Sequence, residues 1–108
     1  MILKRTQVTA TNVGPGLERR VLASDGSLML VEVSFQKGSV GEVHSHPHEQ
    51  VTYVVKGSVE LKLGDEKQII KAGDSYYVAP NVAHGVVALE ETILIDIFTP
   101  QREDFIKK

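Results

Sequence analysis

The sequence contains no cysteine, so disulfide bonds and thiolate chemistry are unavailable to it and any metal must be held by nitrogen and oxygen. Its charges nearly cancel, with 12 basic against 14 acidic residues and a formal net charge of -2. No basic field exists to gather nucleic acid or anionic lipid. The residues after Met1–Leu3 turn polar at once, and no apolar run is long enough to span a bilayer. We therefore expect no nucleic-acid or membrane partner and a cytoplasmic location.

The length of the chain predicts one domain. With 108 residues, 42% of them hydrophobic, it can bury a single core but hardly two. We find no linker-like composition and no internal repeat. We therefore expect residues 1–108 to form one unit.

Short runs of β-branched and aromatic residues, separated by glycine-containing turns, predict an all-β fold. The runs with this pattern are Leu28–Phe35, Gln50–Val55, Val59–Leu63 and Thr92–Phe98. Such regular punctuation is typical of a sandwich or barrel. Only the tail, residues 101–108, reads as a possible helix.

The stretch HSHPHEQ, residues 44–50, gathers most of the histidines. Side chains two apart on a strand point to the same face, so His44 and His46 can approach one ion together. The same parity favours Gln50 over Glu49 as a further ligand. Pro47, which lies between His46 and Gln50, can break the register, so both residues remain open at this point.

A third imidazole is available from His84, just after the turn-forming pair Pro80 and Asn81. The ordinary alternative is a set of surface or core histidines with satisfied hydrogen bonds, and local spacing alone leaves the two readings balanced. Imidazole and oxygen donors do not select one metal, so zinc, nickel, iron and manganese are all candidates for a single divalent ion.

These histidines and the glycines around them resemble the two motifs of the cupin superfamily. The first motif, G-x(5)-H-x-H-x(3,4)-E-x(6)-G, is matched without a gap by Gly38, His44, His46, Gln50 and Gly57. The second is matched in part by Gly73 and His84, with Asn81 in place of a glycine. The resemblance implies a small β-barrel, the double-stranded β-helix or jelly roll, spanning about residues 28–100 and holding a metal inside.

Glutamine stands where the first motif has glutamate. A carboxylate would lower the charge of the site, whereas the amide of Gln50 leaves the full divalent charge available to polarise a substrate oxygen. This favours Lewis-acid chemistry over redox chemistry.

A carboxylate interrupts the apolar run TILIDIF, residues 92–98. On strand parity Asp96 shares a face with Leu94 and Phe98, and burying it unpaired is costly unless a partner or a reaction compensates. It is either a paired or solvent-facing residue or a general acid or base. Arg102, just past the end of the run, is either an ordinary surface arginine or a group that captures a substrate carboxylate.

The resemblance sharpens to the KdgF-like pectin-degradation proteins over Val31–Phe105. It is carried by VEVSFQKGSVGEVHSHPHEQVTYVVKG, KAGDSYYVAPNVAHGVV and ETILIDIFTPQREDF. It implies metal ligands at His44, His46, Gln50 and His84, catalytic Asp96 and Arg102, and substrate binding by Phe98 and Arg102. The implied activity is metal-dependent linearisation of 4,5-unsaturated monouronates to 5-keto-4-deoxyuronates by a homodimer that binds a small sugar acid.

Two other functions remain open: an Fe(II)-dependent cupin dioxygenase, and a non-catalytic sensor of sugar acids. The first 25 or so residues carry little signal and are expected to form outer strands or a dimer edge. We interpret Arg19–Arg20 as solvated charges and His48 as a mouth or surface residue. Glu49 is a candidate to orient a ligating histidine.

Overall fold

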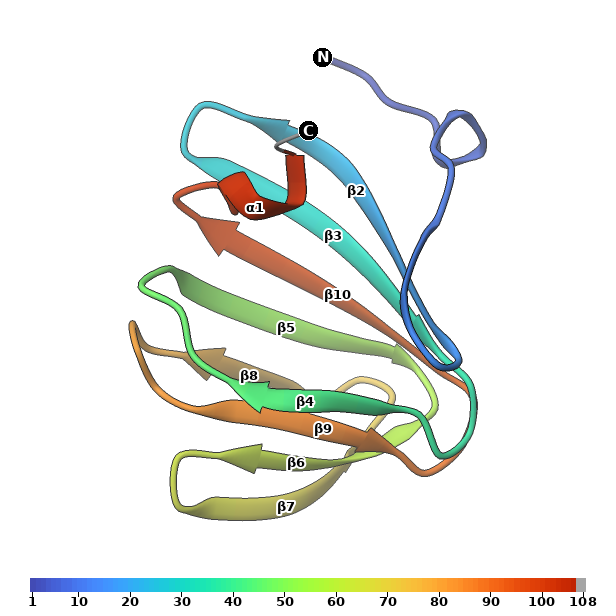
Figure 1. The fold of residues 1–108 in the computed structure, drawn as a ribbon, viewed down its shortest axis with the longest axis vertical. Coiled ribbons are helices and arrows are strands. Elements are labelled where there is room, and N and C mark those ends of the chain that lie inside the picture. The colour runs from blue at the N-terminus through green and yellow to red at the C-terminus, as the bar shows by residue number, and fades with distance from the viewer. Residues whose placement is uncertain (107–108) are drawn as a thin grey trace.

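The computed structural model describes residues 1–106 and folds into two antiparallel sheets that face each other (Figure 1). The six-stranded sheet has the order β1-β2-β3-β10-β5-β8, and the four-stranded sheet has the order β4-β9-β6-β7. The elements are η1 (Arg5–Gln7), β1 (Thr11–Gly14), β2 (Leu17–Asp25), β3 (Leu28–Phe35), β4 (Val40–His44), β5 (Glu49–Lys56), β6 (Ser58–Leu63), β7 (Glu66–Lys71), β8 (Ser75–Val78), β9 (His84–Ala88), β10 (Thr92–Thr99) and α1 (Glu103–Ile106). The predicted all-β fold is confirmed.

Alternation along the strands decides which side chains enter the space between the sheets. On β10, Leu94 and Phe98 are each 2% exposed, whereas Ile97 on the other face is 43% exposed. The predicted parity of this strand is therefore confirmed, and Asp96 takes the inward face with them. The four strands predicted from sequence are all present, with ends within one residue of the predicted ones.

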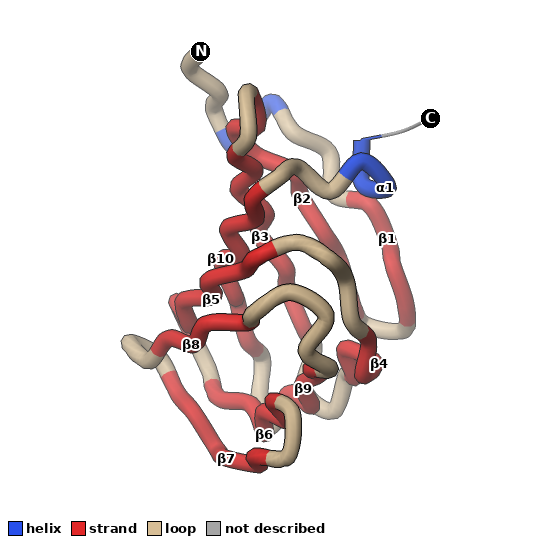
Figure 2. Tube along the Cα trace, turned by 90° about the vertical axis from the view of Figure 1, so that its left-hand side faces the viewer, coloured by secondary structure: helices blue, strands red, loops and turns tan. Residues whose placement is uncertain are grey.

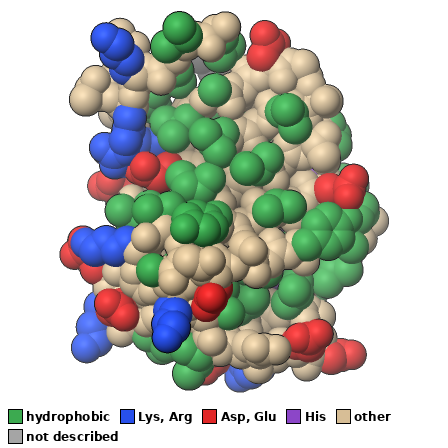
Figure 3. Space-filling view, turned by 180° about the vertical axis from the view of Figure 1, so that it is seen from behind, with side chains coloured by type: hydrophobic (Ala, Val, Ile, Leu, Met, Phe, Trp, Pro, Cys, Tyr) green, Lys and Arg blue, Asp and Glu red, His purple; other side chains and the backbone are tan. Residues whose placement is uncertain are grey.

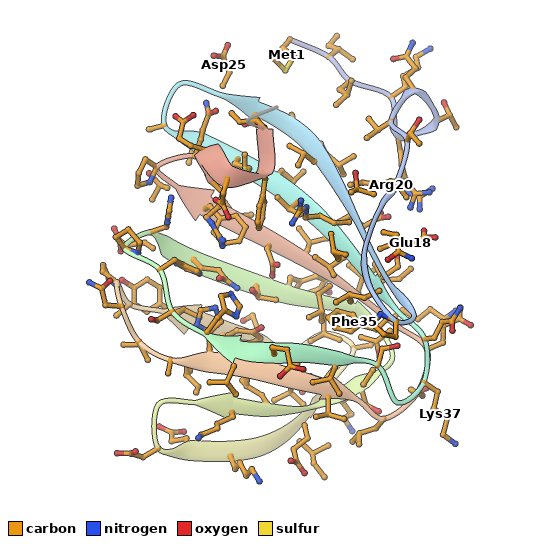
Figure 4. The ribbon with its side chains drawn as sticks, in the orientation of Figure 1. Met1, Glu18, Arg20, Asp25, Phe35 and Lys37 are labelled. Carbon is orange, nitrogen blue, oxygen red and sulfur yellow. The ribbon has the colours of Figure 1, made fainter. Side chains whose placement is uncertain are left out.

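The core has two parts, and both lie on inward-facing strand positions. The larger joins the two sheets through Phe35, Val54, Val59, Leu61, Val86, Ala88 and Leu94, and Figure 4 shows Phe35 between the sheets. The smaller, Met29, Val31 and Phe98, lies on the six-stranded sheet alone. Each fully buried Val or Phe stabilises the fold by roughly 1.5–3 kcal/mol, so these positions hold the sheets together.

The first strands form the edge of the six-stranded sheet, as predicted for outer strands. The last described element is α1, which Figure 2 shows beside β1 and β2. Its Phe105 packs against the smaller core, with its ring centroid 5.7 Å from that of Phe98. The predicted tail helix is confirmed for Glu103–Ile106, and its last part, residues 107–108, lies outside the described residues.

Two backbone positions explain features of the sequence motifs. Gly57 has φ +89°, and a Cβ there would lie 2.3 Å from Oγ1 of Thr92, so the turn after β5 requires glycine. Asn81 has φ 66°, the left-handed conformation expected where the motif has glycine. Among residues 1–106, no helix is long and apolar enough to cross a membrane.

Candidate metal centre

Three imidazoles converge where the start of β9 meets the end of β4. His44 and His84 are direct cross-strand partners, and His46 lies two residues beyond the end of β4. One ring nitrogen from each can be chosen so that all lie within 4.8 Å of one another. His46 and His84 are buried, at 6% and 3% exposure, while His44 is exposed at the rim. A shared metal site requires the segment of His44 and His46 to lie close to His84, and in the structure it does.

Backbone carbonyls hold two of these rings. Nδ1 of His44 donates to the carbonyl of Glu42 at 2.8 Å, and Nδ1 of His84 donates to the carbonyl of Val82 at 2.9 Å. Because a carbonyl can only accept, the proton of each neutral ring is on Nδ1, and Nε2 carries a free lone pair. His46 is held by packing instead, with its ring centroid 5.6 Å from that of Phe98 in an edge-to-face contact.

The amide of Gln50 faces the same point. Its Nε2 donates to Oγ1 of Thr52 at 2.8 Å, and that hydroxyl donates to Oδ1 of Asp96 at 2.6 Å. Since the hydroxyl proton is committed to Asp96, the threonine oxygen accepts from the amide, which turns Oε1 of Gln50 away from Thr52. That oxygen lies 3.0 Å from Nε2 of His46. The Gln50 amide therefore lies beside the cluster of three imidazoles.

The fold decides which of the two candidate ligands, Gln50 or Glu49, faces the interior. Gln50 is 4% exposed, whereas Glu49 is exposed and accepts a hydrogen bond of 2.5 Å from the hydroxyl of Tyr77. Among the described residues Glu49 makes no hydrogen bond to any of the three histidines, so the structure does not support the suggestion that it orients a ligating histidine. His48 is partly buried, and its Nε2 lies 3.2 Å from the carbonyl of Gln101.

The residues fit a divalent cation. Nε2 of His84 is buried and has no hydrogen-bond partner among the described residues, which is costly unless a ligand satisfies it. Burial lowers the pKa of His84 to about 4, and burial likewise lowers the pKa of His46. Both rings are therefore neutral near pH 7, the form that binds a metal. The assignment of the ion to these ligands remains a prediction.

Asp96 lies beside this donor set, in a cavity of about 320 Å³ that is also lined by His44, Gln50 and His84. The surface that it keeps faces this cavity, and burial raises the pKa of its carboxyl group from 3.8 to about 6. Neighbouring Tyr76 has its phenol pKa raised, first by burial and then by the charge of Asp96. The site thus holds an acid that changes protonation near neutral pH.

Arg102 reaches the same cavity, 9% exposed. Its Nε and Nη2 donate to the two carboxylate oxygens of Asp104 at 3.0 and 2.8 Å. Its guanidinium carbon lies 5.2 Å from the centroid of the Phe98 ring and 4.2 Å from that of Phe105. Arg102 and Phe98 both line the cavity, but one edge of the guanidinium already has a carboxylate.

Sequence reasoning missed Thr52 and misjudged Arg19. Thr52 is fully buried and links Gln50 to Asp96, but a threonine within a strand gives no local signal of this role. The interpretation of Arg19 as a solvated charge is wrong, because it lines the cavity. Arg20 takes the other face of β2 and pairs with Glu32 at 3.4 Å. Alternation along β2 was the available signal, since one of two adjacent arginines must face inward.

Comparison with known proteins finds a matching family model, a similar sequence and similar structures. Residues 31–98 match the family model of the cupin domain. The pectin degradation protein KdgF of Dickeya dadantii is 45% identical over 96 residues, covering 87% of each chain. The structure of KdgF from a Halomonas species superposes with a TM-score of 0.92 at 36% identity, covering 97% of both chains. An RmlC-like cupin from Shewanella frigidimarina superposes with a TM-score of 0.91 at 42% identity, covering 94% of this chain and 92% of its own.

Proposed function

Because this chain belongs to the cupin domain family and resembles KdgF proteins over most of its length, we propose that it is a metal-dependent enzyme of pectin or alginate breakdown. Its reaction is the linearisation of 4,5-unsaturated monouronates to 5-keto-4-deoxyuronates. The observation that carries this proposal is Asp96, an acid with a near-neutral pKa set beside a cluster of neutral metal donors.

Four side chains would hold the ion: His44, His46, His84 and Gln50. When bound there, a divalent cation supplies Lewis acidity, which stabilises negative charge that develops on a substrate oxygen. Nickel, zinc, iron and manganese all accept such a donor set. The network through Thr52 holds the Gln50 amide with its oxygen toward the imidazoles, so a neutral ligand is presented without rearrangement.

Asp96 would move the protons. Linearisation leaves the composition of the sugar unchanged: the anomeric hydroxyl loses a proton, the bond between C1 and the ring oxygen breaks, and C4 gains a proton as the enol becomes a ketone. A carboxyl group at this position would accept the first proton and donate the second, and burial raises its pKa from 3.8 to about 6 in the metal-free protein. The hydrogen bond from Thr52 fixes one carboxyl oxygen, which leaves the other for the substrate.

Arg102 and Phe98 would position the sugar. Phe98 offers an apolar wall beside His46, with ring centroids 5.6 Å apart. Arg102 is the candidate for the uronate carboxylate through the N–H groups that Asp104 does not engage.

A direct assay tests the proposal. Metal-loaded protein is incubated with a monouronate released by a polysaccharide lyase, and the absorbance of the ring alkene is followed. We expect its loss with the wild type, loss of most of the rate in Asp96→Asn with metal content retained, and a normal rate in Asp65→Asn, a change on an exposed turn. No rate above the uncatalysed one would refute the proposal. Oxygen uptake by the iron-loaded protein would instead favour the dioxygenase, and tight binding without turnover would favour a sensor.

We also propose that the enzyme is a homodimer. Exposed apolar side chains gather on the outer face of the six-stranded sheet (Figure 3), and Val51, Tyr53 and Val55 on β5 are each 44–49% exposed. Burying this face against a second copy would remove them from water. We expect Tyr53→Glu to halve the mass measured by sedimentation, whereas Ile69→Glu on the other sheet leaves it unchanged.

A further inference from the structure

Two arginines from distant parts of the chain meet on one aromatic ring. The guanidinium carbon of Arg19, on β2, lies 3.9 Å from the centroid of Phe105, and that of Arg102 lies 4.2 Å from it. Both arginines and the phenylalanine line the cavity that contains Asp96. Stacking on the ring holds each guanidinium in place, so little side-chain freedom is left to lose when a ligand binds.

The hydrogen-bonding capacity of the pair is only partly used. Asp104 takes two donors of Arg102, while Arg19 has no hydrogen-bond or ion-pair partner among residues 1–106. Arg19 is partly buried, and burial lowers its pKa, although a guanidinium stays charged at neutral pH. A partly desolvated cation that makes no ion pair is costly, and an incoming anion that pairs with it relieves that cost.

The other acids that line the cavity make no ion pair with either arginine among the described residues. Asp96 accepts a hydrogen bond from Thr52, and Glu42 is exposed at the rim. Asp104 therefore pairs with Arg102, whereas Arg19 has only a longer-range attraction to that carboxylate and keeps its own N–H donors free.

We propose that Arg19 binds the carboxylate of the substrate, as the unengaged half of a two-arginine anion site whose other half is Arg102. This inference rests on the proposed function for the identity of the anion, a sugar carboxylate. The planar fork of Arg19 matches both oxygens of a carboxylate, which Arg102 cannot offer on the edge that Asp104 occupies. Arg19 is then a specificity residue that selects uronates over neutral sugars.

The test compares Arg19→Met with Arg20→Met. Methionine keeps an apolar side chain against Phe105, and Arg20 lies on the outer side of β2 (Figure 4), where it pairs with Glu32. For the unsaturated monouronate we expect KM to rise about 10- to 100-fold in Arg19→Met, because a charged hydrogen-bonding pair is lost. We expect kcat to stay within a few fold of the wild-type value. Arg20→Met should keep the wild-type KM. Metal content and melting temperature, measured on all three proteins, identify misfolding.

The methyl ester of the same uronate tests the role of the carboxylate charge of the substrate. Removing Arg19 should leave KM for the ester unchanged, because there is no carboxylate to lose. An equal rise in KM for acid and ester would assign Arg19 to packing and overturn the proposal, as would an unchanged KM for the acid.

Binding separates this inference from the enzymatic proposal. If the wild type shows no turnover, calorimetric titration with galacturonate and with its methyl ester still reports on the anion site. Binding of the acid that is lost in Arg19→Met upholds the site while the proposed reaction fails. Equal binding in both proteins, or none in the wild type, overturns the site.

Discussion

Replacing Asp96 by asparagine should stabilise the metal-free protein while it removes activity. The ionised carboxyl group destabilises the folded protein, since burial raises its pKa from 3.8 to about 6. Asparagine keeps an oxygen that accepts from Thr52, at the place where Oδ1 now accepts at 2.6 Å. The variant therefore loses the charge without losing that hydrogen bond.

The magnitude follows from linkage. The folded pKa lies above the unfolded one, so the folded state binds more protons between the two values and the free energy of unfolding falls as pH rises through that window. A rise from 3.8 to about 6 corresponds to about 3 kcal/mol at ~1.4 kcal/mol per pKa unit. The cost is complete above about pH 7 and absent below about pH 3.5. For a domain of this size it equals roughly 12 °C in melting temperature, at about 4 °C per kcal/mol.

Urea unfolding of both proteins in the presence of a chelator, from pH 4 to pH 8, measures this difference. A chelator is needed because a bound cation would lower the carboxyl pKa. We expect Asp96→Asn to be more stable at pH 8 and the two curves to converge at pH 4. Equal stability at pH 8, or a difference that does not shrink on acidification, would refute the view that burial raises the pKa of Asp96 and so destabilises the folded protein.

Three further predictions concern the donor set and the backbone. Gln50→Glu should still bind a divalent ion, measured by elemental analysis, but turn over more slowly, because a carboxylate lowers the charge of the site; unchanged turnover would make the neutral ligand incidental. Nickel or zinc at a hundredfold its Kd should stabilise the wild type by about 2.7 kcal/mol in thermal unfolding, and His84→Gln should lose most of this. Gly57→Ala should cost about 2–4 kcal/mol in urea unfolding because its Cβ would meet Thr92, whereas Gly26→Ala, with open space around it, should cost roughly 1 kcal/mol.

Local periodicity determined much of the fold. The alternation of Thr92–Phe98 placed Asp96 on the inward face with Leu94 and Phe98, and the structure bears this out. The spacing of His44 and His46 likewise indicated a shared site, because side chains two apart on extended backbone point the same way. These features depend on a few neighbouring residues and are therefore visible in sequence.

Features that depend on distant segments were decided only by the tertiary structure. That Gln50 rather than Glu49 faces the histidines follows from the contact of Gln50 with Thr52 and from the outward pairing of Glu49 with Tyr77. The raised pKa of Asp96 comes from burial by the surrounding strands, which no local pattern encodes.

The sequence by itself determined which residues alternate inward and which donor types are present, because backbone geometry repeats every two residues along a strand. Only the tertiary structure decided that Arg19 and Arg102 meet at Phe105, because β2 and the C-terminal segment come together through packing across the sheet. Because the two arginines are close together, partly desolvated and have unused hydrogen-bond donors, they form a candidate anion site.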